Sequence, residues 1–210
     1  MLVIGVTGSI GAGKSHLSRY LVEGYGAVHC DVDMIVHATY ASGRPAFDRI
    51  VAAFGSEVVG ANGEIDRHIL GSQVFGSLDR ARVLRDAIGD YAPDVRSVVD
   101  GWRASLAVGQ VAVLEAFNLV SGGYYRWCDV RWLVRAEDDV AVRRIMQRGQ
   151  LTDAEARARL ASAVPWQRSV DHCDLIIDNN GTVAEFQAAI DGALSNYRVS
   201  IEARAPRHER

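Results

Sequence analysis

The feature that most constrains this chain is a glycine-rich segment, residues 8–15, which directly follows an apolar run at residues 2–6. Its sequence, Gly-Ser-Ile-Gly-Ala-Gly-Lys-Ser, has the GxxxxGK[ST] spacing of a phosphate-binding loop. A helical pattern comes next, with Leu17, Tyr20 and Leu21 on one face. Because such loops join a strand to a helix, this context favours a nucleotide-binding loop over a turn that only caps a helix.

Each residue type in this loop has a physical role at a phosphate site. Glycines at 8, 11 and 13 permit backbone angles that turn successive N–H groups toward phosphate oxygens at a helix start. Lys14 would reach the β- and γ-phosphates of ATP, and Ser15 would offer its hydroxyl to Mg²⁺. Lys14 is the only lysine of the chain, and every other basic residue is arginine. A compact ammonium fits between phosphates, which explains a lysine at this position.

The composition is that of a soluble globular protein, with 49% hydrophobic and 23% charged residues and a net charge of -3. This charge gives no global reason to expect nucleic acid or an anionic membrane as a partner. No apolar run approaches a membrane span, and no basic segment precedes the first apolar run. We therefore expect a cytoplasmic protein that binds neither nucleic acid nor a membrane. A monomer or weak oligomer is our working expectation, which these observations do not by themselves imply.

The chain has three cysteines, Cys30, Cys128 and Cys173, and none of them belongs to a CxxC pair. An odd number of isolated cysteines argues against a zinc site or a disulfide framework. We expect these side chains to be small buried groups.

Five short apolar runs predict strands, at residues 2–6, 27–30, 111–114, 130–134 and 175–177. Helical patterns alternate with these runs, so the sheet should be parallel, with helices on both faces. The sequence therefore predicts an α/β protein with the P-loop NTPase fold and a five-stranded parallel sheet. The expected nucleotide-binding core consists of residues 1–33, 109–147 and 172–201.

Residues 34–108, between the second and third predicted strands, show only helical patterns. One helix is predicted by the phase of Ala46, Ile50, Ala53, Phe47 and Phe54. Residues 66–75 predict another helix, and residues 79–108 predict one or two more, with an interruption near Ala92-Pro93. Because this insertion is too large for a plain crossover, we expect a helical acceptor-binding subdomain.

Residues 148–171 are rich in arginine, alanine and acidic side chains and have few large apolar ones. Thr152 and Glu155 have the spacing of a helix capping box. A surface helix with solvated arginines is one interpretation, whereas arginines beside a phosphate site indicate a mobile helical lid. A final amphipathic helix is predicted from residue 183 to 197, and residues 202–210 are expected to form a disordered tail.

Carboxylates stand at the ends of two predicted strands. Asp31 and Asp33 follow the second strand, at the edge where open α/β sheets bind ligands. Either of them can cap the helix that follows while the other faces the site. Glu115 ends the third strand, where a carboxylate could hold Mg²⁺ through water, and the sequence leaves that role open.

In their order, these segments resemble the dephospho-coenzyme A kinase family, from residue 2 to about residue 197. The matching features are residues 5–15, Asp31-Val32-Asp33, residues 63–67 with Phe75, residues 144–148, Arg159 and residues 177–181. This family transfers the γ-phosphoryl group of ATP to the ribose 3′-hydroxyl of dephospho-coenzyme A. The resemblance therefore implies ATP and Mg²⁺ as cofactors and dephospho-coenzyme A, or a related small molecule, as acceptor.

The resemblance also implies roles for individual residues. Asp33 would accept the hydroxyl proton, Lys14 would hold the ATP phosphates, and Arg144 and Arg148 would complete the catalytic set. The expected ATP-binding residues are Gly8, Ser9, Gly11, Ala12, Gly13, Lys14, Ser15, His16, Arg148, Asn179 and Gly181. The expected acceptor-binding residues are Asp31, Asp33, Asp66, Arg67 and Arg159. The expected metal ligands are Ser15 and Glu115.

The departures from the family pattern gather on the acceptor side. The family usually has His-Pro where this chain has Ala92-Pro93, and Asp-x-Pro-Leu-Leu-Phe-Glu where residues 115–121 read Glu-Ala-Phe-Asn-Leu-Val-Ser. A glutamine and a lysine of the family are replaced by Ala163 and Ser169. Two alternatives stay open: a kinase for another nucleoside or cofactor-precursor hydroxyl, and a nucleotide-binding protein without transfer activity. The intact loop and Asp33 argue against the latter.

Overall fold

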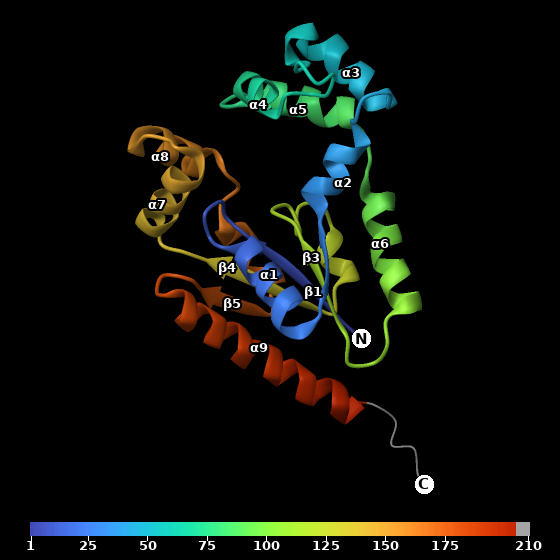
Figure 1. The fold of residues 1–210 in the computed structure, drawn as a ribbon, viewed down its shortest axis with the longest axis vertical. Helices are drawn as coiled ribbons and strands as arrows, with labels where there is room; N and C mark the ends of the chain where they lie inside the picture. The colour runs from blue at the N-terminus through green and yellow to red at the C-terminus, as the bar shows by residue number, and fades with distance from the viewer. Residues whose placement is uncertain (205–210) are drawn as a thin grey trace. The chain divides into compact units, whose positions relative to one another are not determined.

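The computed structural model describes residues 1–204, with side chains through Tyr197. Residues 205–210, which make up most of the expected tail, lie outside the described residues. The chain divides into two compact units, one made of residues 1–30 and 98 onward and the other of residues 31–97 (Figure 1). The second unit is the helical insertion that the sequence predicts at 34–108, although its boundaries lie earlier at both ends.

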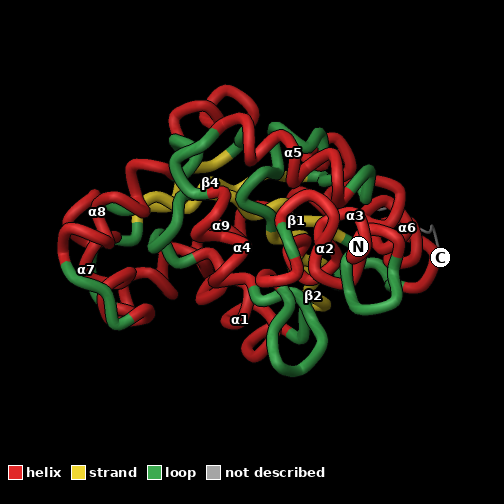
Figure 2. The backbone as a smooth tube through the Cα atoms, turned by 90° about the horizontal axis from the view of Figure 1, so that it is seen from above, coloured by secondary structure: helices red, strands yellow, loops and turns green. Residues whose placement is uncertain are grey.

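The first unit contains one five-stranded sheet with the order β2-β3-β1-β4-β5. Its strands are β1 (Leu2–Gly8), β2 (Val28–Asp31), β3 (Val111–Glu115), β4 (Val130–Arg135) and β5 (Leu175–Asp178). The central strand β1 runs parallel to both β3 and β4, which lie on either side of it, and β4 runs parallel to β5. Figure 2 draws the strands in yellow, with β1, β2 and β4 labelled. All five predicted strands are confirmed to within two residues at each end.

The helices of the first unit include α1 (Lys14–Tyr25), α7 (Asp138–Gly149), α8 (Asp153–Ser162) and α9 (Val183–Arg204), with 3₁₀ turns η2 (Tyr124–Trp127) and η3 (Trp166–His172). Helix α6 (Ala92–Ser105) belongs to both units. The helix α9 continues through residues 202–204, which the sequence assigns to the tail. Among residues 1–204, no helix is both long and apolar enough to cross a membrane.

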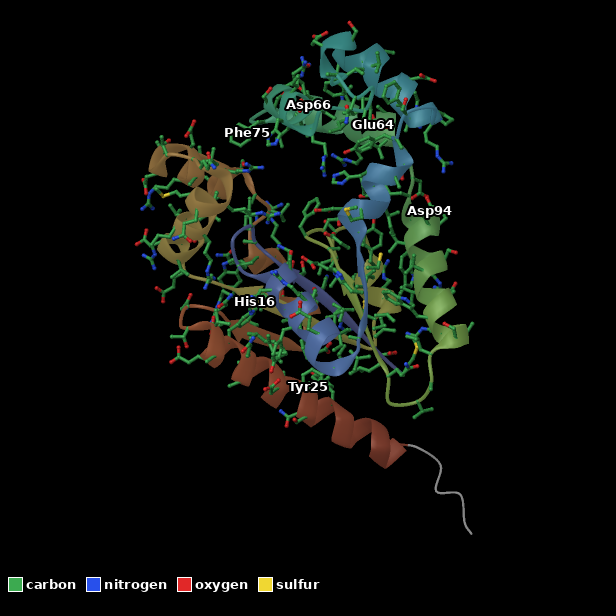
Figure 3. All side chains as sticks on the ribbon, in the orientation of Figure 1. His16, Tyr25, Glu64, Asp66, Phe75 and Asp94 are labelled. Atoms are coloured by element: carbon green, nitrogen blue, oxygen red, sulfur yellow. The ribbon has the colours of Figure 1, made fainter. Side chains whose placement is uncertain are left out.

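One face of the sheet packs against α1 and α9. Leu17 and Leu21 of α1 and Ile190 of α9 are buried there with Trp132 of β4. The predicted apolar face of α1 is therefore confirmed. Tyr25 at the end of α1 donates its hydroxyl proton to Asp191 of α9 at 2.6 Å, which joins the two helices (Figure 3).

The second unit contains helices α2 (Val32–Thr39), α3 (Pro45–Phe54), α4 (Arg67–Val74) and α5 (Leu78–Ile88), with the 3₁₀ turn η1 (Ser56–Val58). Its own core is formed by apolar side chains of these elements, namely Tyr40, Ala46, Ile50, Phe54, Val58, Ile65, Leu70 and Ala87. Between residues 32 and 97 the only sheet-like pairing is an isolated bridge of Val59 with Ile65. The predicted helical character of this insertion is confirmed.

One detail of the predicted phase of α3 is wrong. Ala53 is exposed, and Phe54, one residue later, points into the core. The buried positions of α3 are 46, 50 and 54, an i+4 spacing that puts the larger Phe54 side chain inside. The burial of a phenyl ring removes more apolar area from water than the burial of a methyl group, which explains why Phe54 rather than Ala53 is buried.

Helix α8, within the segment expected to be a lid, packs on α7. Val142 and Ile145 of α7 are buried against Ala156 of α8, with Leu151 beside them. The predicted capping box is confirmed, because Thr152 accepts from the Glu155 backbone N–H while the Glu155 carboxylate accepts from the Thr152 backbone N–H. Helices α7 and α8 therefore form a packed pair.

Candidate active site

The loop between β1 and α1 has the backbone shape that phosphate binding requires. Gly11 and Gly13 have φ angles of 77° and 106°, a region that side chains disfavour. A Cβ on Gly11 would lie 2.8 Å from the Ala141 carbonyl oxygen, and a Cβ on Gly13 would overlap the Asn179 side chain. Gly13 is also the residue that precedes α1. Because glycine has no side chain, no capping group covers the first N–H groups of that helix.

Lys14 places its ammonium group against the backbone of the loop. Its Nζ donates to the carbonyl oxygens of Gly8 at 2.8 Å and Ser9 at 3.1 Å. The ammonium group therefore lies across the loop that the sequence identifies as the phosphate site. A compact charge with three donors at this place can exchange these carbonyl contacts for phosphate oxygens.

Asn179 and Arg144 join the loop to the turn after β5. Asn179 is 6% exposed and donates from Nδ2 to the Ala12 carbonyl oxygen at 2.8 Å. Arg144 donates to Asn179 Oδ1 at 3.1 Å, to the Asn179 carbonyl oxygen at 2.9 Å and to the Gly11 carbonyl oxygen at 3.4 Å. Burial, and then the neighbouring charge of Arg143, lower the pKa of Arg144. Through these contacts, the turn after β5 and helix α7 both hold the loop in one conformation.

Glu115, at the carboxyl end of β3, is only 4% exposed. Its Oε1 accepts from Ser15 Oγ at 2.7 Å, and its Oε2 accepts from Ser18 Oγ at 2.8 Å and lies 3.1 Å from His29 Nε2. Burial by itself raises the pKa of Glu115, but the hydrogen bonds from His29, Ser15 and Ser18 together outweigh it, so that the pKa is lowered. The carboxylate is therefore charged, and each of its oxygens has a hydrogen-bond partner.

Ser15 and Glu115 fit a magnesium ion. Mg²⁺ prefers oxygen ligands, keeps several waters and is usually held by one or two protein groups together with substrate phosphates. Because Ser15 gives its hydroxyl proton to Glu115, the lone pairs of its oxygen stay available to a cation. No group of three or more His, Cys, Asp or Glu side chains that could hold a metal lies within the described part of the chain.

Four of the predicted acceptor-binding residues lie in the second unit, and two of these form helix caps. Asp31 precedes α2 and accepts from the Asp33 backbone N–H at 2.9 Å. Asp66 precedes α4 and accepts from two backbone N–H groups at the start of that helix (Figure 3). Each of these carboxylates thus stabilises a helix start. Asp33 lies in the first turn of α2, half-buried.

Arg67, the fourth of these residues, contacts a histidine that the sequence analysis did not select. Its Nη1 lies 2.9 Å from His37 Nδ1. Burial, and then the charge of Arg67, lower the pKa of His37. His37 is therefore a neutral ring that accepts from the guanidinium, which leaves the other Arg67 donors for a ligand. The only sequence signal for His37 is its position one helical turn after Asp33.

The other predicted residues lie in the first unit. His16 packs its ring at 5.8 Å from that of Phe186 of α9 (Figure 3). Arg148 is exposed in the last turn of α7 and Arg159 is exposed on α8. Gly181 is exposed in the turn before α9. The structure thus brings His16, the loop and Asn179 together, whereas Arg148 and Arg159 present their side chains to solvent.

The sequence analysis missed Ser18 and His29, both of which contact Glu115. A signal for each is visible in retrospect. Ser18 lies three residues after Ser15, on the same face of α1. His29 is a polar residue in the otherwise apolar run 27–30. Neither pattern indicates a partner, because Glu115 is 86 residues or more away along the chain from both.

A parallel sheet with a lysine-bearing phosphate loop at the end of its central strand defines a P-loop NTPase. Comparison with known proteins narrows this class. The sequence model of the dephospho-CoA kinase family matches residues 2–185. The chain belongs to the dephospho-CoA kinase family.

Individual relatives agree with this assignment. The chain is 37% identical to the dephospho-CoA kinase of Geobacter sulfurreducens over 193 residues, which cover 91% of this chain and 96% of the relative. It is 35% identical to that of Geobacillus kaustophilus over 186 residues, covering 88% and 90% of the two chains. Among solved structures, the dephospho-CoA kinase of Campylobacter jejuni has the same fold, with a TM-score of 0.55, 21% identity and coverage of 92% and 96%. The predicted family and fold are confirmed.

Proposed function

We propose that this chain transfers the γ-phosphoryl group of ATP to the ribose 3′-hydroxyl of dephospho-CoA. The observation that carries this proposal is the match to the dephospho-CoA kinase family over residues 2–185, in a chain whose phosphate loop has the required geometry. Relatives bearing that name align over about nine-tenths of this chain. The first unit is the proposed ATP-binding core, and the helical second unit is the proposed acceptor-binding part.

Phosphoryl transfer passes through a loose transition state, so it depends on positioning and positive charge more than on covalent chemistry by the protein. Lys14 and the first N–H groups of α1 are the proposed donors to the ATP phosphates. Arg144 and Asn179 keep the loop in shape for them. Bound Mg²⁺ supplies charge neutralisation at the phosphate oxygens, and Ser15 and Glu115 are the residues proposed to hold it.

Asp33 is the proposed acceptor of the ribose hydroxyl proton. Its backbone N–H is held by the Asp31 carboxylate, which fixes the first turn of α2 and hence the start of its side chain. A carboxylate can orient the attacking hydroxyl and take its proton as the new P–O bond forms. Arg67, supported by His37, is proposed to bind a negatively charged group of the acceptor, such as its diphosphate.

Arg148, at the end of α7, and Arg159, on α8, are proposed to act as part of a lid formed by residues 148–171. Their exposure means that both guanidinium groups are solvated and can turn toward phosphate when the segment moves. Gly181 and His16 complete the proposed nucleotide contacts. The need for ATP supports the cytoplasm as the proposed compartment, and we propose that the protein works there as a monomer or weak oligomer.

A matched pair of carboxylate variants tests the role of Asp33. Asp33→Asn should keep ATP affinity within about twofold and lower kcat by roughly 10²–10⁴-fold, the usual contribution of a positioned base. Asp48→Asn, which changes an exposed carboxylate of α3 in the same unit, should leave kcat unchanged. The assay is consumption of ATP with dephospho-CoA and Mg²⁺. Full activity in Asp33→Asn would remove this residue from the mechanism.

A further inference from the structure

Two contacts of Glu115, those with Ser18 and His29, have no assigned role in the proposed reaction. The Glu115 carboxylate joins three elements of the first unit: the end of β3, the first turns of α1 and the strand β2. Ser18 is fully buried and Glu115 is 4% exposed, while the His29 side chain is 28% exposed. The Ser18 contact is therefore shielded from water, whereas Ser15 and His29 are exposed residues that reach the buried carboxylate from its outer side.

The two oxygens of this carboxylate have different partners. Oε2 is bound by Ser18 and His29, and Oε1 is bound by Ser15 alone. The Ser18 and His29 contacts fix the rotation of the carboxylate about its last torsion, since turning it would break both. A glutamate has one torsion more than an aspartate, so its end group needs such partners to stay in one place.

We infer that His29 and Ser18 are positioning residues for the magnesium site. By binding Oε2 they keep Oε1 on the Ser15 hydroxyl proton, and the oxygen lone pairs of Ser15 then face away from Glu115, where a cation can use them. The inference rests on the proposed function only as far as Mg²⁺ with ATP. It does not depend on which molecule accepts the phosphoryl group.

The positions of these residues in the fold explain how the cluster forms. Ser15 and Ser18 are three residues apart in α1 and thus present both hydroxyls on one side of the helix. The strand that carries His29 is the neighbour of β3 in the sheet, so its imidazole can reach the end of β3. A cluster that only stabilised the fold would have the same contacts. A positioning role and a purely structural role therefore differ only in their effect on metal affinity.

A metal titration separates these roles. Mn²⁺, which replaces Mg²⁺ and is visible by electron paramagnetic resonance, is titrated into protein held in excess over the ATP analogue AMP-PNP. Two variants remove one donor each: His29→Leu and Ser18→Ala. We expect each to weaken Mn²⁺ binding to the protein–AMP-PNP complex by roughly 10–100-fold, the usual effect of removing a group that orients a metal ligand. Affinity for AMP-PNP in EDTA should change less than about twofold.

Two further variants serve as controls. His29→Gln keeps an N–H donor at nearly the reach of Nε2 and should retain most of the Mn²⁺ affinity. His172→Leu removes an exposed histidine that stacks on Tyr125 in the same unit, and it should have no effect. A melting curve of each variant shows that it is folded, and the partial exposure of His29 makes its substitutions tolerable.

Unchanged Mn²⁺ affinity in both His29→Leu and Ser18→Ala would overturn the inference. Equal losses in His29→Gln and His29→Leu would also overturn it, because the donor would then not be the cause. If Ser18→Ala does not fold, the His29 pair decides the question alone. A failure to phosphorylate dephospho-CoA leaves all these readings intact, so the inference and the proposed acceptor fail separately.

Discussion

Substitution of Asn179 by alanine tests whether the phosphate loop is held in shape from the turn after β5. The side chain makes two hydrogen bonds, one to the buried Ala12 carbonyl oxygen at 2.8 Å and one from Arg144 at 3.1 Å. Asn179→Ala leaves the Ala12 carbonyl, in a residue 1% exposed, without this donor. An unsatisfied buried group of this kind costs about 1–3 kcal/mol.

The loss of the hydrogen bond from Arg144 should cost less free energy than the loss of a hydrogen bond from a charged group usually does. Arg144 keeps its bonds to the backbone oxygens of Asn179 and Gly11, so only about 1 kcal/mol is expected from this bond. Together the two losses should lower the free energy of unfolding by about 2–4 kcal/mol, which for a chain of this size lowers Tm by about 4–16 °C. ATP affinity should fall as well, because the loop would no longer hold one conformation.

Urea unfolding followed by circular dichroism measures the free energy, and calorimetry measures the ATP affinity. The matched control is Asn180→Ala, which removes the exposed neighbouring amide that accepts from the Glu137 backbone N–H at 2.7 Å. This exposed bond should be worth no more than about 1 kcal/mol. A loss below about 0.5 kcal/mol in Asn179→Ala, or equal losses in both variants, would refute the reasoning.

Four further predictions concern the loop, the carboxylate and the acceptor side. Lys14→Ala should abolish transfer and weaken ATP binding in calorimetry, and unaltered turnover would overturn the assignment of the loop. Gly13→Ala forces a side chain into a backbone region with φ near 106° and into a neighbouring amide, so Tm should fall and ATP affinity should drop at least tenfold. The lowered pKa of Glu115 means that its stabilising contribution is present above its ordinary value of 4.5 and is lost as pH falls through the folded value. Urea midpoints from pH 7 to pH 3 should therefore fall less steeply in Glu115→Gln, and parallel curves would contradict this. The lowered pKa of His37 predicts that KM for dephospho-CoA rises only below pH 6.5, because the protonated ring releases and repels Arg67. The same rise in KM in His37→Asn would show that another group causes it.

The sequence predicts the sheet and the loop well because both depend on local patterns. Each strand is an apolar run bounded by turn residues, and a central parallel strand is buried on both faces, so it needs no alternation. The loop is recognisable because its glycines are required one by one, as the crowding at Gly13 shows. Asp31 could be recognised as one of two possible helix caps, and the structure selects it over Asp33.

The contacts that shape the candidate site could not be predicted, because they join residues far apart in the sequence. The Asn179 amide meets the Ala12 carbonyl across 167 residues, and Glu115 meets Ser18 across 97. No periodicity or motif encodes such pairs. Asp66 differs in this respect, since its cap contacts are local and its position directly before α4 is a signal for them.

The exposed arginines of the α7–α8 segment also could not be told apart from the sequence. Arg157 lies between the predicted Arg148 and Arg159, and it forms ion pairs with Asp153 and Asp139. Two carboxylates thus hold the Arg157 guanidinium group at the surface, whereas Arg148 and Arg159 are characterised only by their exposure to solvent. The Asp153 partner lies one helical turn earlier on α8, a spacing that the sequence shows, whereas the Asp139 partner depends on how α8 packs on α7.

The most direct test of the central claim is mass spectrometry of the product formed from dephospho-CoA, ATP and Mg²⁺. The account predicts a product that is heavier by one phosphoryl group, with the added group on the ribose 3′-hydroxyl. It also predicts that kcat/KM for dephospho-CoA is well above kcat/KM for nucleosides or other hydroxyl acceptors. ATP binding without a phosphorylated product, or a higher kcat/KM for another acceptor, would contradict it.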